Sequence, residues 1–297
     1  MPLTPSPPPL AQTPPLHLLI IGAGLSGLAA SISTALSGHF VTIFESSPNL
    51  HEIGAGLQLT PNGTQLLSKW GIADDLGPKA TAPSTMCIRR FDGRVLARRQ
   101  DYHQGGYGSP MWCLHRVDLQ LALARRAEAL GVVLRLGCKV TGVGFEDATV
   151  VLESGERVKG DLVLAADGLW SAARSLFLGQ PTMPKPTGDL AYRILLRAED
   201  IADEELRAWV TKPGLNIWIG PGMHIVAYSI QGGSMYNMVL LVPDDLPKDT
   251  AKGQGDIWEM QRLFENWDPM FVHDISYSGP ELPSALTYLM QSQPIPI

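Results

Sequence analysis

A glycine-rich turn between an apolar run and a helix-forming stretch constrains this chain more than any other feature. Residues 16–21 are apolar, and the turn that follows them reads Gly22-Ala23-Gly24-Leu25-Ser26-Gly27. In such a G-x-G-x-x-G turn the first glycine permits a tight bend, the second lets the backbone approach a pyrophosphate, and the third lets helix and strand pack closely. The sequence therefore predicts that Gly22, Gly24 and Gly27 hold a dinucleotide at a helix N-terminus.

An acidic residue completes this pattern. A second β-rich run, residues 40–44, ends at Glu45, and a carboxylate at that place accepts hydrogen bonds from the ribose hydroxyls of an adenosine. The alternative is a transmembrane helix, because residues 16–36 carry no formal charge and are long enough to span a bilayer. The glycines cluster at one end of that stretch and several hydroxyl residues dilute it, which favours the βαβ unit.

Composition narrows the class of protein. The chain has 297 residues, 45% hydrophobic and 18% charged, which is typical of a globular protein, and its net charge of −6 gives no basic footprint for nucleic acid. Cys87, Cys113 and Cys138 are dispersed and lack metal-ligand spacing, so they indicate reduced thiols in a cytoplasmic protein without a metal site. Residues 1–15 are rich in proline and contain no basic residue, so we expect a disordered leader rather than a signal peptide.

Three further segments carry recognisable patterns. A Gly54-Ala55-Gly56 segment precedes a helix start at Thr60-Pro61, and a second helix opens at His115-Arg116-Val117-Asp118-Leu119. An apolar run from Asp161 ends in Asp167-Gly168 and leads into a helix start with Ser171 and Arg174. This last pattern repeats the logic of the first turn: a strand end, a polar group and a helix N-terminus.

The sequence pattern changes from alternating helices and strands to β-rich runs after residue 187. Four β-rich runs, separated by glycine-containing turns, predict an antiparallel sheet that forms a second layer; they are residues 190–196, 215–219, 223–230 and 235–242. We therefore predict an α/β fold with a Rossmann-like, dinucleotide-binding βαβ domain and an antiparallel β-sheet layer; the family resemblance given next implies that the first binds FAD and the second binds substrate. The predicted domains are the leader 1–15, the cofactor domain 16–180, the sheet 181–250 and an incomplete helical segment 251–297.

Together these motifs resemble the single-component FAD-dependent aromatic hydroxylases, close to the salicylate-hydroxylase-like monooxygenases of fungi. The resemblance rests on the glycine turn with Glu45, on the segments 54–62 and 115–119, and on the segment 166–174, and it covers nearly everything from Leu16 to Met290. It implies an enzyme that uses NADH or NADPH, FAD and O2 to hydroxylate a small aromatic substrate, phenolic or polyketide-like, with a role in secondary metabolism.

The resemblance also implies roles for individual residues. Glu45 would bind the adenosine ribose, Gly56 would lie beside the cofactor, and Arg116 would contact FAD from its helix. Asp167-Gly168 is similar to a second fingerprint tied to FAD and nicotinamide binding. On the residues alone, Arg116 could instead be a surface arginine at a helix start, and Asp167 could be a helix N-cap that makes no cofactor contact.

The antiparallel layer would form the substrate pocket. Tyr192-Arg193 resembles a strand of the family whose arginine is a proposed active-site residue, and Arg193 could bind a substrate carboxylate in a bidentate manner. His224 and Tyr228 are four residues apart, so on a strand they point to the same face. His224 is the candidate base that removes a phenol proton; the alternatives are a structural histidine and an ordinary surface or FAD-proximal arginine.

One motif of the family is missing. Its third fingerprint, a Gly-Asp pair that follows an apolar strand and opens a helix, has no counterpart here, although residues 283–290 look like the segment just before it. We therefore interpret the chain as a hydroxylase cut short at its C-terminus. The remaining alternatives are a flavin oxidase or dehydrogenase of the same fold, and a catalytically impaired nucleotide-binding protein that acts as a partner.

Overall fold

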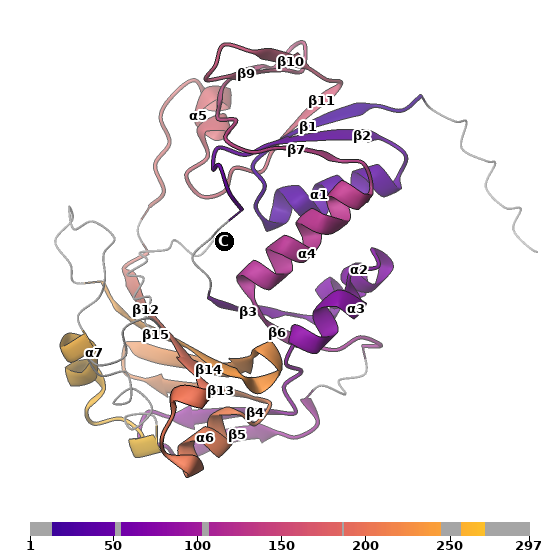
Figure 1. Cartoon of the computed structure of the whole chain (residues 1–297). Coiled ribbons are helices and arrows are strands. Elements are labelled where there is room, and N and C mark those ends of the chain that lie inside the picture. Colours follow the sequence, from indigo (N-terminus) through magenta and orange to yellow (C-terminus); the bar gives the residue numbers. More distant parts are fainter. Residues whose placement is uncertain (1–13, 51–54, 103–106, 186, 245–256, 271–297) are drawn as a thin grey trace, which may run out of the picture. The chain divides into compact units, whose positions relative to one another are not determined.

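The computed structural model describes residues 14–50, 55–102, 107–185, 187–244 and 257–270, in two compact units (Figure 1). Unit 1 comprises Met1–Leu50 and Leu123–Thr182, and unit 2 comprises His51–Ala122 and Met183–Ile297. The units are thus interleaved along the sequence, whereas the predicted domains are consecutive segments. Most of the predicted leader, and residues 271–297 of the predicted C-terminal segment, lie outside the described residues.

Unit 1 is built on a four-stranded parallel sheet, as the glycine turn predicts. Its strand order is β11-β1-β2-β7, with β1 (His17–Ile21), β2 (Phe40–Phe44), β7 (Val133–Arg135) and β11 (Leu162–Ala165). Helix α1 (Leu25–Leu36) connects β1 to β2, and the residues of α4 (Arg116–Ala129) from Leu123 onward belong to this unit. Leu19, Ile20 and Ile43 are fully buried, which is expected for parallel strands covered on both faces.

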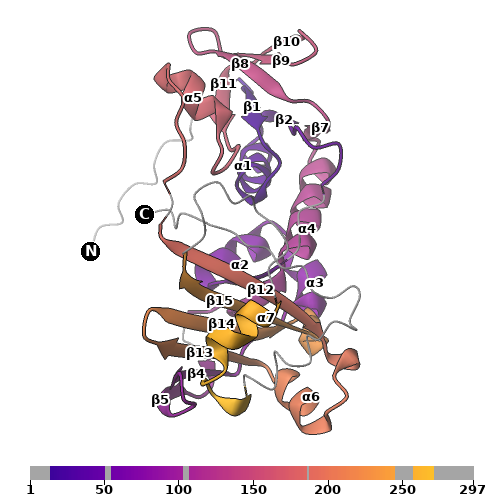
Figure 2. The same cartoon turned by 90° about the vertical axis from the view of Figure 1, so that its left-hand side faces the viewer.

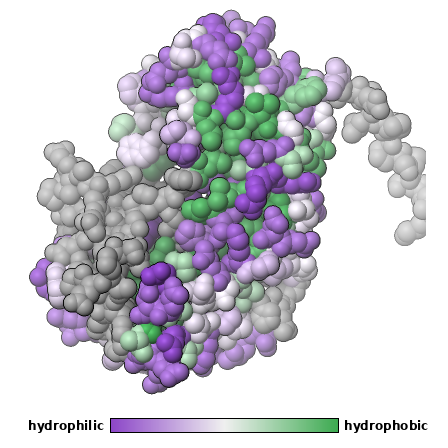
Figure 3. Space-filling view, viewed as in Figure 1, coloured by the Kyte–Doolittle hydropathy of each residue, from purple (hydrophilic) through white to green (hydrophobic). Residues whose placement is uncertain are grey.

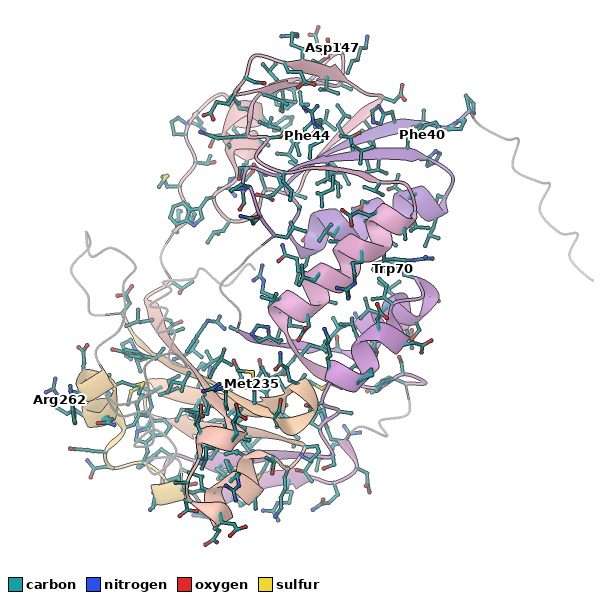
Figure 4. The ribbon with its side chains drawn as sticks, viewed as in Figure 1. Phe40, Phe44, Trp70, Asp147, Met235 and Arg262 are labelled. Carbon is teal, nitrogen blue, oxygen red and sulfur yellow. The ribbon has the colours of Figure 1, made fainter. Side chains whose placement is uncertain are left out.

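A smaller antiparallel sheet completes unit 1. Its order is β10-β9-β8, with β8 (Val140–Gly144), β9 (Thr149–Leu152) and β10 (Arg157–Lys159). Val150 and Leu152 of this sheet share a core with Leu19 and Phe44 of the parallel sheet and with Ala173 of α5 (Ala172–Leu178). The small sheet therefore covers the parallel one through apolar contacts; Phe44 is labelled in Figure 4.

Unit 2 contains the predicted antiparallel sheet, enlarged by a hairpin from the first half of the chain. The strand order is β12-β15-β14-β13-β4-β5, with β12 (Asp189–Arg197), β15 (Met235–Pro243), β14 (Met223–Ile230), β13 (Gly214–Gly220), β4 (Thr85–Arg90) and β5 (Val95–Arg99). All neighbouring pairs are antiparallel except β13 with β4, which is parallel. The four predicted runs after residue 187 are thus confirmed as strands.

The two faces of this sheet have different partners. One face carries Tyr192, Trp218 and Met238, which pack with residues of α6 (Glu204–Val210) and α7 (Ile257–Phe264) in the largest core of the unit. Figure 2 shows α6 and α7 beside the strands. Because side chains alternate along a strand, the other face carries Arg193, Tyr228 and their alternate neighbours. We call this second face the Arg193 face.

Shorter elements of unit 2 lie before and after the hairpin in the sequence. They are β3 (Gly56–Leu59), α2 (Pro61–Lys69), α3 (Ala73–Leu76) and β6 (Trp112–His115), with short 3-10 turns at Gly77–Lys79, Ala198–Asp200 and Gln231–Gly233. β3 and β6 pair antiparallel, with Gly56 opposite His115. Within the part of the chain that the structure describes, no helix is both long and apolar enough to cross a bilayer.

Candidate active site

Glycine is explained by a different structural feature at each of the three positions of the turn. Gly22 has a φ of +102°, and a Cβ atom there would lie 2.6 Å from the carbonyl oxygen of Ala166. A Cβ atom at Gly27 would overlap the carbonyl oxygen of Gly22, so only glycine lets α1 pack this closely on β1. No atom lies within 4 Å of the Cβ position at Gly24, which leaves the backbone open to a ligand.

The N-terminus of α1 suits a phosphate group. Gly24 is the N-cap, no side chain caps the helix, and its first turn contains no acidic residue. The first N–H groups of a helix have no partner within the helix, and its dipole favours an anion at this end. The turn therefore fits the pyrophosphate of a dinucleotide.

Glu45 holds the same turn from the end of β2. Its Oε2 accepts a hydrogen bond from the Ala23 N–H at 2.8 Å, and its Oε1 accepts bonds from the Ser47 N–H at 2.8 Å and the Ser46 hydroxyl at 3.1 Å. A carboxylate offers about four acceptor positions. Glu45 thus retains capacity for a ribose hydroxyl while it fixes the turn.

Asp167 lies in a network that stabilises the start of α5. Its Oδ1 accepts from the Ser171 hydroxyl at 2.6 Å, and its Oδ2 accepts from the Ala173 N–H at 3.0 Å. Ser171 is the N-cap of α5, and Arg174 donates to the carbonyl of Leu169 at 3.0 Å. Gly168 has a φ of +74°, which glycine adopts without strain. The carboxylate thus supports the first turn of α5, although Ser171 rather than Asp167 is the N-cap, and the cofactor contact of Asp167 stays a prediction.

A large cavity of unit 1 adjoins this network. Its volume is about 840 Å³, and it is lined by residues of β11 and α5, by Ser26 of the first turn of α1, and by Asp167 and Gly168. β11 is an edge strand of the parallel sheet, and Leu162 on it is 59% exposed. Hydrophobic residues gather on the side of unit 1 that Figure 3 shows. The sequence predicts Asp167 and Gly168 as site residues but does not indicate this cavity, because the cavity depends on β11 lying at an edge of the sheet.

In unit 2, Gly56 lies against Asn237 of β15. The Gly56 N–H donates to Asn237 Oδ1 at 2.8 Å, and a Cβ atom at Gly56 would lie 2.5 Å from Asn237 Cγ. The Arg116 N–H, at the start of α4, donates to the carbonyl of Ala55 at 3.0 Å. The glycine of the predicted Gly-Ala-Gly segment is therefore required here by close packing on a side chain.

Asp118 of the second predicted helix start makes structural bonds. Its Oδ1 pairs with Lys79 Nζ at 2.9 Å, and its Oδ2 accepts from Gln231 Nε2 at 3.1 Å. These bonds connect α4 with two 3-10 turns of unit 2. The position and the orientation of the N-terminus of α4 are therefore fixed by protein contacts that do not depend on a ligand.

The three predicted catalytic residues lie on the same face of the large sheet. Arg193 is on β12, His224 and Tyr228 are on β14, and alternation places all three on the Arg193 face. His224 is exposed, whereas Tyr228 is buried. Met235 at the start of β15, labelled in Figure 4, marks the strand between them.

Burial dominates the electrostatics of this face. It lowers the pKa of Arg193, and the nearby Arg116 charge lowers it further, while Tyr228 acts in the opposite direction. Burial raises the pKa of Tyr228 well above its usual range, and Cys113 adds to this effect. The phenol of Tyr228 is therefore a hydrogen-bond donor at neutral pH.

Sequence reasoning missed Asn237. It is fully buried on the Arg193 face, directly opposite Tyr228 on β14 and Leu195 on β12. The available signal was its amide group within an otherwise apolar strand, Met235-Tyr236-Asn237-Met238-Val239. Buried polar side chains of this kind nearly always have a bonding function.

A family model described as "FAD dependent oxidoreductase" matches residues 64–275. The chain belongs to this family. The match includes most of unit 2 and the Asp167-Gly168 segment, so the resemblance that the sequence motifs indicate is confirmed.

Curated relatives are FAD-dependent monooxygenases. The "FAD-dependent monooxygenase OpS4" of Beauveria bassiana is 51% identical over 263 residues, which is 86% of this chain and 62% of the relative. The "FAD-dependent monooxygenase atnJ" of Arthrinium sp is 33% identical over 95% of this chain and 67% of the relative. The chain thus spans less than two thirds of the length of the first of these relatives.

Solved structures share the fold. CtdE, in complex with FAD and a substrate, has a TM-score of 0.77 at 21% identity, covering 89% of this chain and 66% of CtdE. FqzB has a TM-score of 0.77 at 25% identity, covering 93% of this chain and 64% of FqzB. The predicted α/β fold, with its βαβ unit and antiparallel sheet, is confirmed.

Proposed function

We propose that this chain carries the core of an FAD-dependent monooxygenase that hydroxylates a small aromatic substrate with NAD(P)H and O2. The observation that carries the proposal is the shared face of Arg193, His224 and Tyr228, in a chain whose glycine turn is intact. Relatives support the substrate class: a "3-hydroxybenzoate 6-hydroxylase 1" of Aquipseudomonas alcaligenes is 33% identical over 75% of this chain, and a "Hispidin-3-hydroxylase" is 28% identical.

The chain's residues fit the cofactor. Gly22, Gly24 and Gly27 leave a backbone surface and a helix N-terminus suited to the pyrophosphate, and Glu45 retains acceptor capacity for the ribose. Gly168 and Gly56 would contribute backbone, and Asp167 and Arg116 are the remaining predicted contacts. When bound, FAD would supply the electron transfer from NADH or NADPH and the activation of O2.

The residues of the Arg193 face would bind and activate the ring. The guanidinium of Arg193 would bind a carboxylate of the substrate through paired N–H donors. His224 would accept a phenol proton at an imidazole nitrogen, because the phenolate that results is more electron-rich than the phenol. Tyr228, kept protonated by burial, would donate a hydrogen bond to a substrate oxygen. His224 is exposed, so in this role a bound ligand must cover it.

Two alternative functions follow from specific observations. Asp167 already accepts hydrogen bonds from Ser171 and Ala173, a role that needs no cofactor, so a catalytically impaired flavin-binding protein is the second candidate. The family description is broader than hydroxylation, so a flavin oxidase of the same fold is the third. A role in secondary metabolism and a location in the cytoplasm are further parts of the proposal; the cytoplasm is supported by the three free cysteines.

The visible spectrum of the purified chain, before and after addition of FAD, tests the proposal first. Flavin bands of bound FAD, followed by NADPH or NADH consumption that depends on an aromatic acid and places ¹⁸O from O2 in the product, would support the monooxygenase. Substrate oxidation without ¹⁸O incorporation would support the oxidase. Tight FAD binding without any turnover would support the impaired flavin-binding protein, and failure to bind FAD would contradict all three.

A further inference from the structure

The buried amide of Asn237 is an unusual feature of the Arg193 face. The side chain has no exposed surface, and its neighbours on the same face of β15 are Met235, Val239 and Leu241. A buried amide lowers the stability of the folded state unless its donors and acceptors are hydrogen-bonded, because each of these groups loses its bonds to water on burial. Its two ends therefore need separate explanations.

The oxygen end is explained by Gly56. The Gly56 N–H donates to Oδ1 at 2.8 Å, over a separation of 181 residues in sequence. This bond also fixes the orientation of the amide, because the opposite orientation would place an N–H donor against another donor. The nitrogen, Nδ2, must therefore point away from Gly56.

The nitrogen end has no protein partner. Asn237 Nδ2 is buried and makes no hydrogen bond among the described residues, and the same holds for Arg193 Nε. Arg193 lies opposite Val239, so it is the diagonal neighbour of Asn237 across β12 and β15, at a typical separation of about 7–8 Å. Tyr228 lies directly opposite Asn237 on β14.

These three side chains together form a set of hydrogen-bond donors. The guanidinium has only donors, the free end of the amide has only donors, and the phenol is protonated at neutral pH. Two of these donors, Arg193 Nε and Asn237 Nδ2, are buried without an acceptor among the described residues, and a ligand that supplies an acceptor would satisfy both. An anionic oxygen satisfies such a set best, because hydrogen bonds to a charged acceptor are about twice as strong as neutral ones.

We propose that Asn237 is a binding residue that, together with Arg193 and Tyr228, receives the carboxylate of an aromatic acid, while its oxygen positions Gly56. This inference rests on the proposed function and deepens it, because it assigns the substrate to the aromatic acids. It also adds a residue that neither the motifs nor the family match identifies.

The test is calorimetric titration of the full chain with FAD present. The probes are 3-hydroxybenzoate and 3-hydroxybenzyl alcohol, which share the phenol ring and differ in the carboxylate. The informative variant is Asn237→Asp, which retains an acceptor for the Gly56 N–H but replaces the donor end with an acceptor. We expect it to weaken 3-hydroxybenzoate binding by roughly tenfold or more, and to change binding of the alcohol less than about threefold.

Asn216→Asp is the matched control. Asn216 lies on β13 of the same sheet, but alternation places it on the opposite face, where its Oδ1 accepts from Arg89 Nη1 at 2.7 Å. The aspartate would keep that bond, so 3-hydroxybenzoate binding is expected to be unchanged. Arg193→Gln is the second variant; it makes no change at Gly56 and is expected to show the same selective loss as Asn237→Asp.

Three results would overturn the inference. They are unchanged affinity of Asn237→Asp for 3-hydroxybenzoate, an equal loss of both probes, which a purely structural role predicts, and no preference of the unmodified protein for the carboxylate. If Asn237→Asp fails to fold, an unchanged preference in Arg193→Gln overturns it equally. The measurement needs no turnover, so Asn237-dependent binding without hydroxylation would contradict the proposed function and leave the inference intact.

Discussion

A Cβ atom at Gly27 would occupy the space of the Gly22 carbonyl oxygen, whereas the Cβ position at Gly24 is open. These two glycines of one motif thus have separable roles, since Gly27 is required by packing and Gly24 is available for a ligand. The backbone of Gly24 has a φ of −67°, which alanine adopts without strain.

We therefore expect opposite phenotypes from two substitutions of the same size. Gly27→Ala should lower the free energy of unfolding by about 1–3 kcal/mol or more, because the clash is with backbone that cannot rotate away. Gly24→Ala should change the melting temperature by only a few degrees but weaken FAD binding, since its methyl group occupies the open surface. Thermal unfolding and FAD titration of both variants are the check; equal loss of stability in both would contradict this assignment.

The contact of Asp167 with Ser171 predicts a stability defect independent of any cofactor. Asp167→Ala removes the acceptor of the Ser171 hydroxyl and of the Ala173 N–H, which lie at 2.6 and 3.0 Å. Loss of such capping bonds costs about 1–3 kcal/mol. Urea unfolding without added FAD should show this loss. Ser171→Ala in the Asp167→Ala background should cost less than in the unmodified protein, because the two residues share one bond.

The three cysteines should differ in reactivity. Cys87 and Cys113 are buried, and burial raises the pKa of Cys113 to about 12, whereas Cys138 is partly exposed. Only thiolates react rapidly with disulfide reagents. Ellman's reagent at pH 8 should therefore modify one thiol in the native protein and three in urea, and Cys138→Ser should remove the native reaction. Rapid native modification of Cys113 would contradict its burial.

His115 should make stability depend on pH. Burial lowers its pKa below the ordinary value of 6.5, and the nearby Asp118 acts in the opposite direction. The unfolded state then binds the proton more readily than the native state between the two pKa values. This contribution to stability is present above about pH 6.5 and is lost as the pH falls through the native pKa.

Urea unfolding at pH 7.5 and pH 5.5 measures this effect. The free energy of unfolding should fall at the lower pH, and the fall should be smaller in His115→Gln, which keeps an amide of similar size without the titration. An identical fall in the variant would assign the pH dependence to other groups.

Leu162 offers a test of the free edge of β11. It is 59% exposed on an edge strand whose described partner is β1 alone, and edge strands with apolar side chains promote association between chains. Leu162→Lys should leave the free energy of unfolding within about 0.5 kcal/mol of the original. Light scattering should show less self-association than in the unmodified protein. The contrasting variant is Leu19→Lys, at a fully buried position of the adjacent strand β1, which is expected to unfold the protein.

The features that the sequence predicts best are those set by residues close together in the chain. The glycine turn, the strand after it and the terminal Glu45 were predictable, because each glycine's role follows from one bend and one packing contact. The strands after residue 187 were predictable from alternation and turn residues. The same alternation correctly placed His224 and Tyr228 on one face.

Contacts over long sequence separations were not predictable. The Gly56–Asn237 bond joins residues 181 positions apart, and no local pattern distinguishes an asparagine that accepts such a bond from one at a strand end. The Asp92-Gly93 turn between two β-rich runs is typical of a hairpin such as that of β4 and β5, but no local pattern indicates the parallel pairing of β4 with β13. Asp167 shows a further limit, since one sequence pattern suits both a helix cap and a cofactor contact.

The pairing of β1 with β11 has a consequence for synthesis of the protein. Ile21 of β1 pairs with Ala165 of β11, so 144 further residues must be synthesised after Ile21 before β11 can cover this edge of β1. At about 5–20 residues per second, a ribosome needs roughly 7–30 seconds for that length. During this interval the edge of β1 that later pairs with β11 exposes unpaired backbone groups and apolar side chains. We therefore expect chaperones to bind the nascent chain until β11 has been synthesised.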